Sequence, residues 1–256
     1  MKNLKSLVLL ALVFLMVPVI SAQEKKTQAF WIHEDHVMLS KTMDYEKVSK
    51  ELVDNLKKHD IQDEKWLAAS TSDNRYLFIG ALNKMADLDR PLFGTLSSKM
   101  GKEGLGDLFN RMDKCYTKHV DYIIYLDNDL SYMPGGMTMT PEGQDYREFH
   151  YLHFKPGNAA AVKEQMKAVK KLFVDKDSKV HYRVYRSGFG ASGDFYMVAI
   201  AAKDHLDMAQ KGKTNDELLG EEGGKTFGAL WSHLTKYKKY EGKMRPDLSY
   251  TPKKSM

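Results

Sequence analysis

The sequence predicts an α+β protein in which one βαββαβ unit occurs twice in tandem. Residues 106–132 match residues 224–250 without a gap, at a constant offset of 118. Both copies end in the tetrapeptide Asp-Leu-Ser-Tyr, at 129–132 and 247–250. A repeat of this kind indicates a duplicated unit of about 110 residues, so the same order of strands and helices is expected in both halves.

The first unit is expected over residues 28–132. Alternating and apolar segments predict its four strands at Ala29–Val37, Trp66–Thr71, Tyr76–Leu82 and Val120–Leu126. Ser72-Asp73-Asn74 separates the second strand from the third and has the composition of a hairpin turn.

Two helices complete this unit. The first is predicted from about Met43 to His59, because Val48, Leu52 and Leu56 recur every four residues, and Thr42 is its expected N-cap. The second is expected to run through Leu108–Lys118, after glycines at 101, 104 and 106.

The second unit, expected over residues 146–250, repeats this order. Its strands are predicted at Phe149–Phe154, Val180–Tyr185 and Phe195–Ala202, with a final strand that leads to Asp247. One helix opens at Pro156, and the last helix is expected to include Phe227–Tyr237. Residues 133–145 contain prolines and glycines without strand or helix periodicity, which indicates a linker.

The order βαββαβ is that of a ferredoxin-like unit, whose sheet has helices on one face only. A second copy of the same sheet can cover the other face. On this topology and repetition, the chain resembles the dimeric α/β-barrel superfamily, with both halves fused in one chain. The resemblance implies two ferredoxin-like units packed sheet to sheet as a pseudo-dimeric α/β barrel.

Residues 1–22 have the pattern of a secretory signal peptide. Lys2 and Lys5 precede an uncharged run from Leu7 to Ile20, and Ala22 is a small residue at the expected cleavage point. Fourteen uncharged residues are too few for a membrane-spanning helix, which needs about 20. We therefore expect a secreted or periplasmic protein without stable membrane insertion.

Charge and cysteine content limit the classes of partner. Without residues 1–22 the chain has 37 Lys and Arg against 34 Asp and Glu, interspersed along its length. This pattern does not indicate a nucleic-acid-binding surface. Cys115 is the only cysteine, so an intramolecular disulfide is impossible. A small-molecule ligand is the expected partner, and an oligomer is left open.

Histidine pairs occur in the first strand of each unit, at His33 and His36 and at His150 and His153. Residues i and i+3 of a strand point to opposite faces, so neither pair is expected to bind a metal, and no metal site is predicted. One histidine from each unit could still approach a shared ion. The pattern predicts no cofactor but leaves a haem with a single axial histidine open.

The candidate ligand-binding residues are polar side chains on strands that should be covered on both faces. Trp31, His33 and Asp35 share one face of the first strand, and an ionisable group that is buried needs a partner. The same reasoning applies in the second unit. The predicted ligand-binding residues, expected around a cleft between the two sheets, are His33, Asp35, His150, His181, Arg183 and Tyr185.

No catalytic residue is predicted. Gly188 to Gly193 spells G-x-G-x-x-G, but it precedes an apolar strand where a dinucleotide site would need a helix. Three functions stay open. The first is a secreted barrel that binds a small ligand or partner between its sheets. The others are a barrel enzyme of the cofactor-independent monooxygenase or haem-handling type, as the resemblance implies, and a structural envelope protein.

Overall fold

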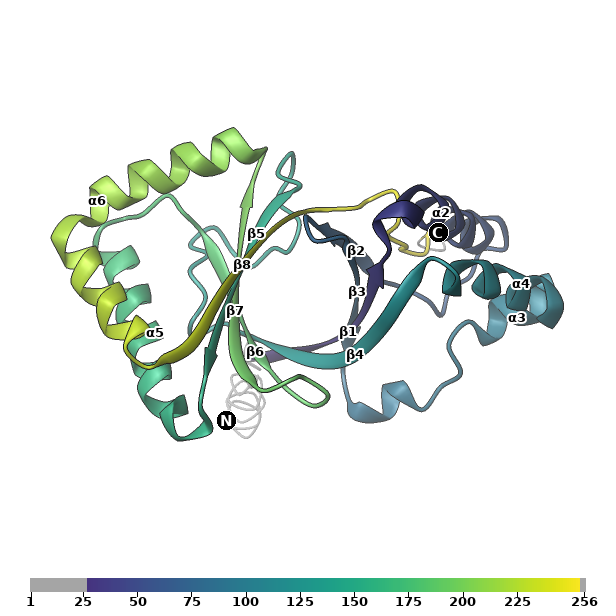
Figure 1. Ribbon diagram of the computed structural model, residues 1–256, viewed down its shortest axis with the longest axis horizontal. Helices are drawn as coiled ribbons and strands as arrows, with labels where there is room; N and C mark the ends of the chain where they lie inside the picture. The colour runs from purple at the N-terminus through teal and green to yellow at the C-terminus, as the bar shows by residue number, and fades with distance from the viewer. Residues whose placement is uncertain (1–26, 254–256) are drawn as a thin grey trace, which may run out of the picture.

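A computed structural model describes residues 27–253. The predicted signal peptide, residues 1–22, lies outside the described residues. The described chain forms a closed eight-stranded β-barrel with helices packed against two opposite sides of its outer surface (Figure 1). This confirms the predicted fold class: two ferredoxin-like units packed sheet to sheet as a pseudo-dimeric α/β barrel.

Each unit contributes four antiparallel strands. In the first unit they are β1 (Thr27–Val37), β2 (Leu67–Thr71), β3 (Arg75–Leu82) and β4 (Tyr116–Asp127). In the second they are β5 (Tyr146–Phe154), β6 (Tyr182–Ser187), β7 (Asp194–Ala202) and β8 (Leu234–Met244). The order around the barrel is β1-β3-β2-β8-β5-β7-β6-β4, so each unit keeps its own four strands together.

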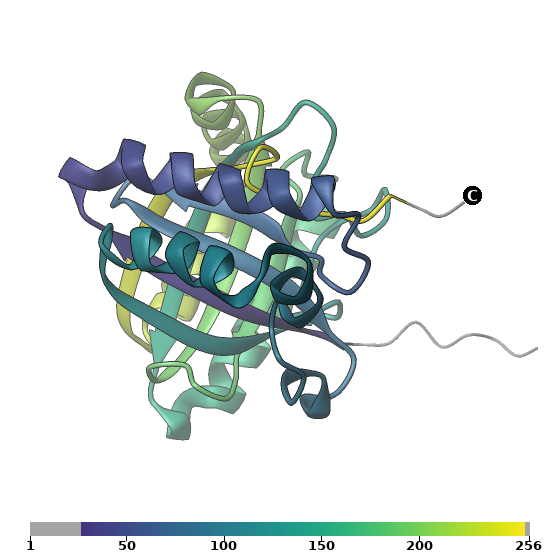
Figure 2. The same ribbon diagram turned by 90° about the vertical axis from the view of Figure 1, so that its right-hand side faces the viewer.

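The helices of each unit cover the outer face of its own sheet. The first unit has η1 (Leu39–Lys41), α2 (Thr42–Lys58), η2 (Met85–Leu88), α3 (Gly94–Met100) and α4 (Lys102–Asp113). The second has η3 (Pro156–Asn158), α5 (Ala159–Asp175) and α6 (His205–Trp231). Figure 2 shows α2 and α4 lying side by side across the strands of the first unit. None of the helices within residues 27–253 is long and apolar enough to span a bilayer.

The two units are joined along both edges of their sheets. Strand β2 pairs with β8 at Ala69–Thr71, and β4 pairs with β6 at Ile124–Leu126. These pairings satisfy the main-chain groups that an open sheet would expose at its edges. The barrel is therefore a product of both units.

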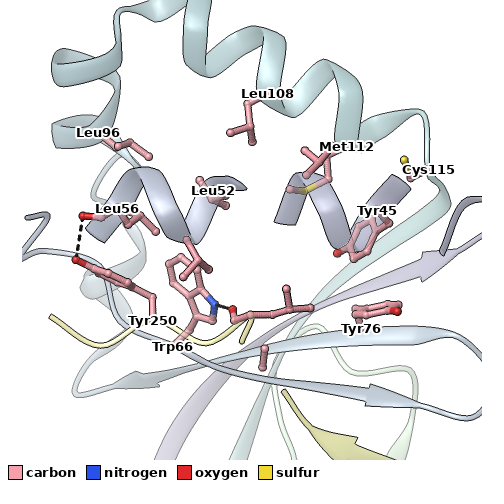
Figure 3. Close-up of a cluster of buried hydrophobic side chains, with 14 of the residues drawn as sticks. Tyr45, Leu52, Leu56, Trp66, Tyr76, Leu96, Leu108, Met112, Cys115 and Tyr250 are labelled. Carbon is pink, nitrogen blue, oxygen red and sulfur yellow. Dashed lines mark hydrogen bonds between the residues drawn. The ribbon is translucent and has the colours of Figure 1, made fainter. Parts of the chain in front are cut away.

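Buried apolar side chains form three clusters. One fills the barrel and includes Ile32, Tyr122 and Met197. The other two lie between each sheet and its own helices. Figure 3 shows the outer cluster of the first unit, in which Trp66 and Tyr250 pack beneath the helices.

The predicted boundaries of the last helix in each unit were wrong, at the same position of the repeat. The helix expected through Leu108–Lys118 ends at Asp113, and the one expected to include Phe227–Tyr237 ends at Trp231. In both units the next strand begins shortly afterwards and pairs with the first strand. Pairing with a neighbouring strand outweighed local helical periodicity there. Thr42 is the first residue of α2 instead of its N-cap, and its hydroxyl donates to the carbonyl of Leu39.

Gly242 marks the tightest contact at the junction of β2 and β8. A Cβ at this position would clash with the carbonyl oxygen of Ser70 and would lie 3.2 Å from Cα of Thr71. Both atoms belong to the backbone, which cannot rotate away. The backbones of β2 and β8 can therefore approach closely because Gly242 has no side chain.

We predict that Gly242→Ala lowers the free energy of unfolding by about 1–3 kcal/mol, because the added carbon forces the two strands apart. Urea denaturation followed by circular dichroism measures the change. Gly212→Ala in α6 is the control, because a Cβ there meets no atom within 4 Å. That variant is expected to stay within about 1 kcal/mol of the natural protein or to gain stability. Equal stability of the Gly242→Ala variant and the natural protein would contradict the prediction.

Candidate functional site

A cavity of about 470 Å³ lies between the sheet of the first unit and its helices. Strands β1 and β3 form its floor, with His33 and Phe78 side by side in register. Leu52 of α2 and Phe109 of α4 contribute from the helices above the sheet. The cavity is therefore on the outer side of the barrel.

Aromatic side chains form most of the walls of this cavity. Trp66 packs edge-on against both Phe78 and Phe93, at ring-centroid distances of 6.3 and 5.9 Å. Phe93 also contacts Phe109 at 5.3 Å. The indole N–H of Trp66 donates to the carbonyl of Leu248, so this donor already has a partner within the protein. The walls offer flat apolar surfaces to a ligand.

Glu64 holds the loop that closes one side of the cavity. Its carboxylate is buried and accepts two hydrogen bonds from Arg90, at 2.9 and 3.0 Å. It also accepts the backbone N–H of Phe93 at 2.8 Å. Phe93 has a φ of 58°, a left-handed conformation that is unfavourable for an aromatic residue. The bond from Glu64 helps to hold this strained residue in the cavity wall.

The polar end of the cavity is built around His33. Its Nδ1 lies 2.9 Å from Oδ1 of Asp121, and its Nε2 lies 3.2 Å from Oδ1 of Asp35. The ring of His119 is 5.4 Å from that of His33, measured between centroids. Asp35 and His119 are opposite each other in the pairing of β1 with β4, as are His33 and Asp121. Strand register therefore brings two imidazoles and two carboxylates together.

Asp35 is the most buried group at this end, with 1% of the residue exposed. Its Oδ2 accepts a 2.5 Å hydrogen bond from the hydroxyl of Tyr45. Its Oδ1 makes no hydrogen bond, although it lies near His33. Burial, the charge of Asp35 and this hydrogen bond together raise the pKa of the Tyr45 phenol well above its usual value. Tyr45 therefore donates to Asp35 at neutral pH.

The charge of His33 follows from its two carboxylate neighbours. Burial alone would lower the pKa of the imidazole, but the close carboxylates of Asp35 and Asp121, one beside each ring nitrogen, outweigh it and raise the pKa to about 9. In the absence of a bound cation, His33 is therefore protonated at neutral pH.

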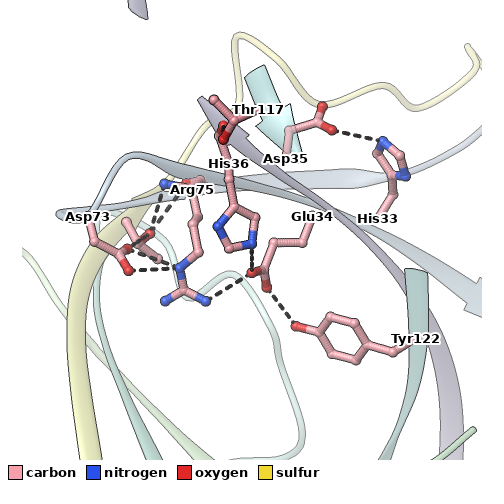
Figure 4. Close-up of polar contacts among 9 residues, drawn as sticks. His33, Glu34, Asp35, His36, Asp73, Arg75, Thr117 and Tyr122 are labelled. Atoms are coloured by element: carbon pink, nitrogen blue, oxygen red, sulfur yellow. Dashed lines mark hydrogen bonds and ion pairs between the residues drawn. The ribbon is translucent and has the colours of Figure 1, made fainter. Parts of the chain in front are cut away.

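The face of β1 that carries Glu34 points into the barrel. Figure 4 shows His33 and Asp35 on one side of the strand and the Glu34 side chain directed toward Arg75 and Tyr122. Arg75 and Tyr122 donate to Glu34 at 3.1 and 2.9 Å. This buried ion pair therefore lies on the barrel side of β1, and the sheet separates it from the outer cavity.

The candidate residues do not meet in a cleft between the two sheets, and that part of the prediction was wrong. His33 and Asp35 face the helices, whereas Tyr185 packs inside the barrel against Phe30. The apolar cluster fills that space and leaves a cavity of only about 30 Å³. The two inner faces are mainly apolar and pack together closely, so they leave no room there for a ligand of ordinary size.

The remaining candidate residues of the second unit lie elsewhere. His181 and Arg183 line a separate cavity beside the linker, where Arg183 donates to the carbonyl of Thr138, and Arg183 also borders the small cavity inside the barrel. His150 lies on the outer face of β5, 2.8 Å from the hydroxyl of Tyr237 and 3.2 Å from Glu148. A ligand-binding role for His150, His181, Arg183 and Tyr185 stays a prediction.

The space equivalent to the cavity is filled in the second unit. His33 and Asp35 correspond to His150 and Leu152 at an offset of 117. Gly80, opposite Trp31, corresponds to Ile200, opposite Glu148. Apolar side chains between β5–β7 and the helices α5 and α6, such as Val162 and Leu230, form a packed cluster there.

His119, Trp66 and the loop residue Phe93 line the cavity but were not among the predicted site residues. The repeat carries a signal for His119, because its counterpart at an offset of 118 is Tyr237, a residue of different chemical class. Antiparallel pairing of the first and last strands of a unit then places His119 near Asp35. Phe93 gave no comparable signal, since its position depends on Glu64, 29 residues away.

Comparison with known proteins supports the fold. No protein-family model and no curated sequence matches the chain. An anthrone oxidase-like protein of known structure aligns with 87% of this chain and 92% of its own, at 12% identity and a TM-score of 0.55. A proposed monooxygenase from Lactobacillus acidophilus aligns over 89% and 97%, at 9% identity and a TM-score of 0.50.

A haem-binding protein from Thermus thermophilus aligns over 86% of this chain and 93% of its own, at 13% identity and a TM-score of 0.43. That likeness is too weak to support an argument about function. The first two similarities show a shared dimeric α/β-barrel fold.

Glu148 lies beside His150 on β5, the strand of the second unit that corresponds to β1. The pH dependence of stability tests their interaction. The hydrogen bond with His150 lowers its pKa to about 2, with burial opposing the shift and Lys239 adding to it. A lowered pKa stabilises the folded state above the unfolded value of about 4.5, and this contribution disappears as the pH falls toward 2.

We predict that Glu148→Gln costs about 2 kcal/mol of unfolding free energy at pH 7 and almost nothing near pH 2. Urea denaturation at a series of pH values measures the difference between the two proteins. A difference that persists unchanged at pH 2 would show that the charge of Glu148 is not responsible.

Proposed function

We propose that the protein is an enzyme that binds a flat, mainly apolar aromatic molecule in the outer cavity of the first unit and oxidises it with dioxygen. The observation that carries this proposal is an aromatic-walled cavity that ends in a buried, partly unpaired carboxylate beside two imidazoles. A binding site of this composition gives affinity through its walls and orientation through its polar end.

The size and lining of the cavity favour a small organic ligand. Its volume of about 470 Å³ lies within the usual range of small-molecule sites, roughly 300–1,000 Å³. Trp66, Phe78 and Phe93 present flat surfaces on which an aromatic ring can stack or pack edge-on. An oxygen-bearing edge of the ligand would then meet Asp35 and His119.

The reaction class is supported by the proteins that share the fold and by the polar end. Two structural relatives are described as anthrone oxidase-like and as a proposed monooxygenase. For a substrate with a ring methylene, the balanced reaction is CH₂ + O₂ → C=O + H₂O, in which the carbon loses four electrons and dioxygen gains them. At the polar end Asp35 is buried, whereas His119 is exposed, so dioxygen can reach the site from solvent.

The chain's own residues hold and orient the reacting groups. Tyr45 and Asp121 fix the side chains of Asp35 and His33, respectively, through hydrogen bonds of 2.5 and 2.9 Å. The Oδ1 of Asp35 is the oxygen that still lacks a hydrogen bond. Asp35 is therefore held in place at the end of the cavity where the substrate's polar edge would lie.

Haem is the cofactor that the resemblance leaves open, and the donors at this site do not fit it. A haem iron has four positions filled by the porphyrin and takes a neutral imidazole as an axial ligand. Here His33 has a carboxylate near each ring nitrogen, and the donor atoms of Asp35, His33 and His119 lie within 4.8 Å of one another. Three converging side-chain donors exceed the axial positions that a haem iron can offer.

The test uses anthrone, whose central methylene is the reacting group in the balanced equation. We expect dioxygen uptake above the rate of spontaneous oxidation, with one O₂ consumed per anthrone. Anthrone should also quench tryptophan fluorescence, because Trp31 and Trp66 line the cavity. Gly80→Val should reduce both signals at least about tenfold, since it places a branched side chain against Trp31 in the cavity.

Ile200→Val is the matched control at the equivalent position of the second unit and should leave both signals unchanged. Quenching without dioxygen uptake would reduce the proposal to a non-catalytic binding protein. The absence of both signals in the natural protein, or equal loss in both variants, would overturn it.

A further inference from the structure

We infer that His33, Asp35 and His119 form a binding site for one divalent first-row transition-metal ion. Each residue offers one donor atom, and these atoms lie within 4.8 Å of one another. They come from two adjacent strands of the first unit, β1 and β4, whose pairing sets their spacing. The three side chains meet at the polar end of the aromatic cavity.

The distance between two of the donors suits a shared ion. Nε2 of His33 and Oδ1 of Asp35 are 3.2 Å apart, but Oδ1 of Asp35 accepts no hydrogen bond. Two ligands at about 2.1 Å from a metal, at an angle of roughly 90–110°, are separated by about 3.0–3.4 Å. The observed pair therefore has the separation of neighbouring ligands.

The groups behind the donors have the arrangement that supports metal ligands. Asp121 lies 2.9 Å from Nδ1 of His33, so Nδ1 can donate its proton to Asp121 while Nε2 coordinates an ion. Carboxylate partners of this kind orient metal-binding histidines and raise their basicity. Tyr45 holds the other oxygen of Asp35, so its Oδ1 is the one left to coordinate.

Burial gives an independent reason for an ion at this position. Asp35 is 1% exposed, and a buried carboxylate oxygen without a hydrogen bond is unfavourable. A cation at the point where the three donors converge would compensate this charge.

The donor set indicates the class of metal. Two imidazoles and one carboxylate suit Fe²⁺, Co²⁺ or Zn²⁺, whereas Ca²⁺ and Mg²⁺ prefer oxygen ligands alone. Two histidines and one carboxylate leave open positions on the ion, the arrangement found in non-haem iron oxygenases. The role of Fe²⁺ in oxidation rests on the proposed function, but the metal site does not.

The duplication limits the site to the first unit. The counterparts of His33, Asp35 and His119 are His150, Leu152 and Tyr237. Leucine cannot coordinate a metal, so the second unit keeps a single histidine of the three donors. We therefore expect one ion per chain, and His150 offers a matched control.

The experiment titrates Co²⁺ into metal-free protein that has no added histidine tag. We expect visible absorption bands of bound Co²⁺ that saturate at one ion per chain. His119→Ala and Asp35→Asn should weaken binding at least about tenfold, and Asp121→Asn by about 10–100-fold. His150→Ala should bind Co²⁺ as the natural protein does, and circular dichroism checks that each variant is folded.

Two results would overturn the metal site. One is the absence of saturable binding to the natural protein. The other is binding that folded His119→Ala retains or that His150→Ala loses equally, as expected for surface histidines.

A failure of the proposed oxidation is separable from a failure of this site. Co²⁺ binding is measured without anthrone, and quenching by anthrone is measured in the presence of a chelator. Metal binding without dioxygen uptake supports the site and contradicts the oxidation. Dioxygen uptake without metal binding supports the oxidation and contradicts the site.

Discussion

Burial of the inner faces of both sheets is the constraint on which the rest of the structure depends. Helices cover one face of each ferredoxin-like sheet, and the opposite face is mainly apolar in both units, with the Glu34–Arg75 ion pair buried among its apolar side chains. Each unit therefore needs the other, and pairing of β2 with β8 and of β4 with β6 seals both edges. Because the packed interior leaves little space, a cavity for a small molecule has to form on the outer side of a sheet.

The two units differ in how they fill the space between the sheet and its helices. In the second unit, Ile200 and the side chains beneath α5 and α6 fill the space over the sheet. In the first, Gly80 leaves room beside Trp31, and the loop held by Glu64 places Phe93 at the cavity wall. One copy is thus packed for stability, while the other keeps a cavity at the cost of a strained residue.

Most of the fold could be predicted from the sequence, and the position of the site could not. The 118-residue repeat and the alternation of β1 predicted the architecture and placed His33 and Asp35 on one face of a strand. Which face points toward the helices depends on the packing of two sheets, which local periodicity does not report. Arg183 and Tyr185 were placed with them for this reason, although both border the barrel interior, where Arg183 also bonds to the linker. The predicted ends of the helices that stop at Asp113 and Trp231 were wrong for a similar reason, because strand pairing is a tertiary interaction.

An internal repeat carries a further signal, because each position has a counterpart in the same chain. Met112 against Leu230 exchanges one buried apolar side chain for another, as expected where only packing must be kept. Asp35 against Leu152 and His119 against Tyr237 change chemical class instead, and Asp35 and His119 face each other in the sheet pairing. Burying a carboxylate where the other copy has leucine costs free energy unless something binds it. The second unit forms the same fold without these groups, so the fold does not require them. Their presence in the first unit alone supports the metal site that we infer there.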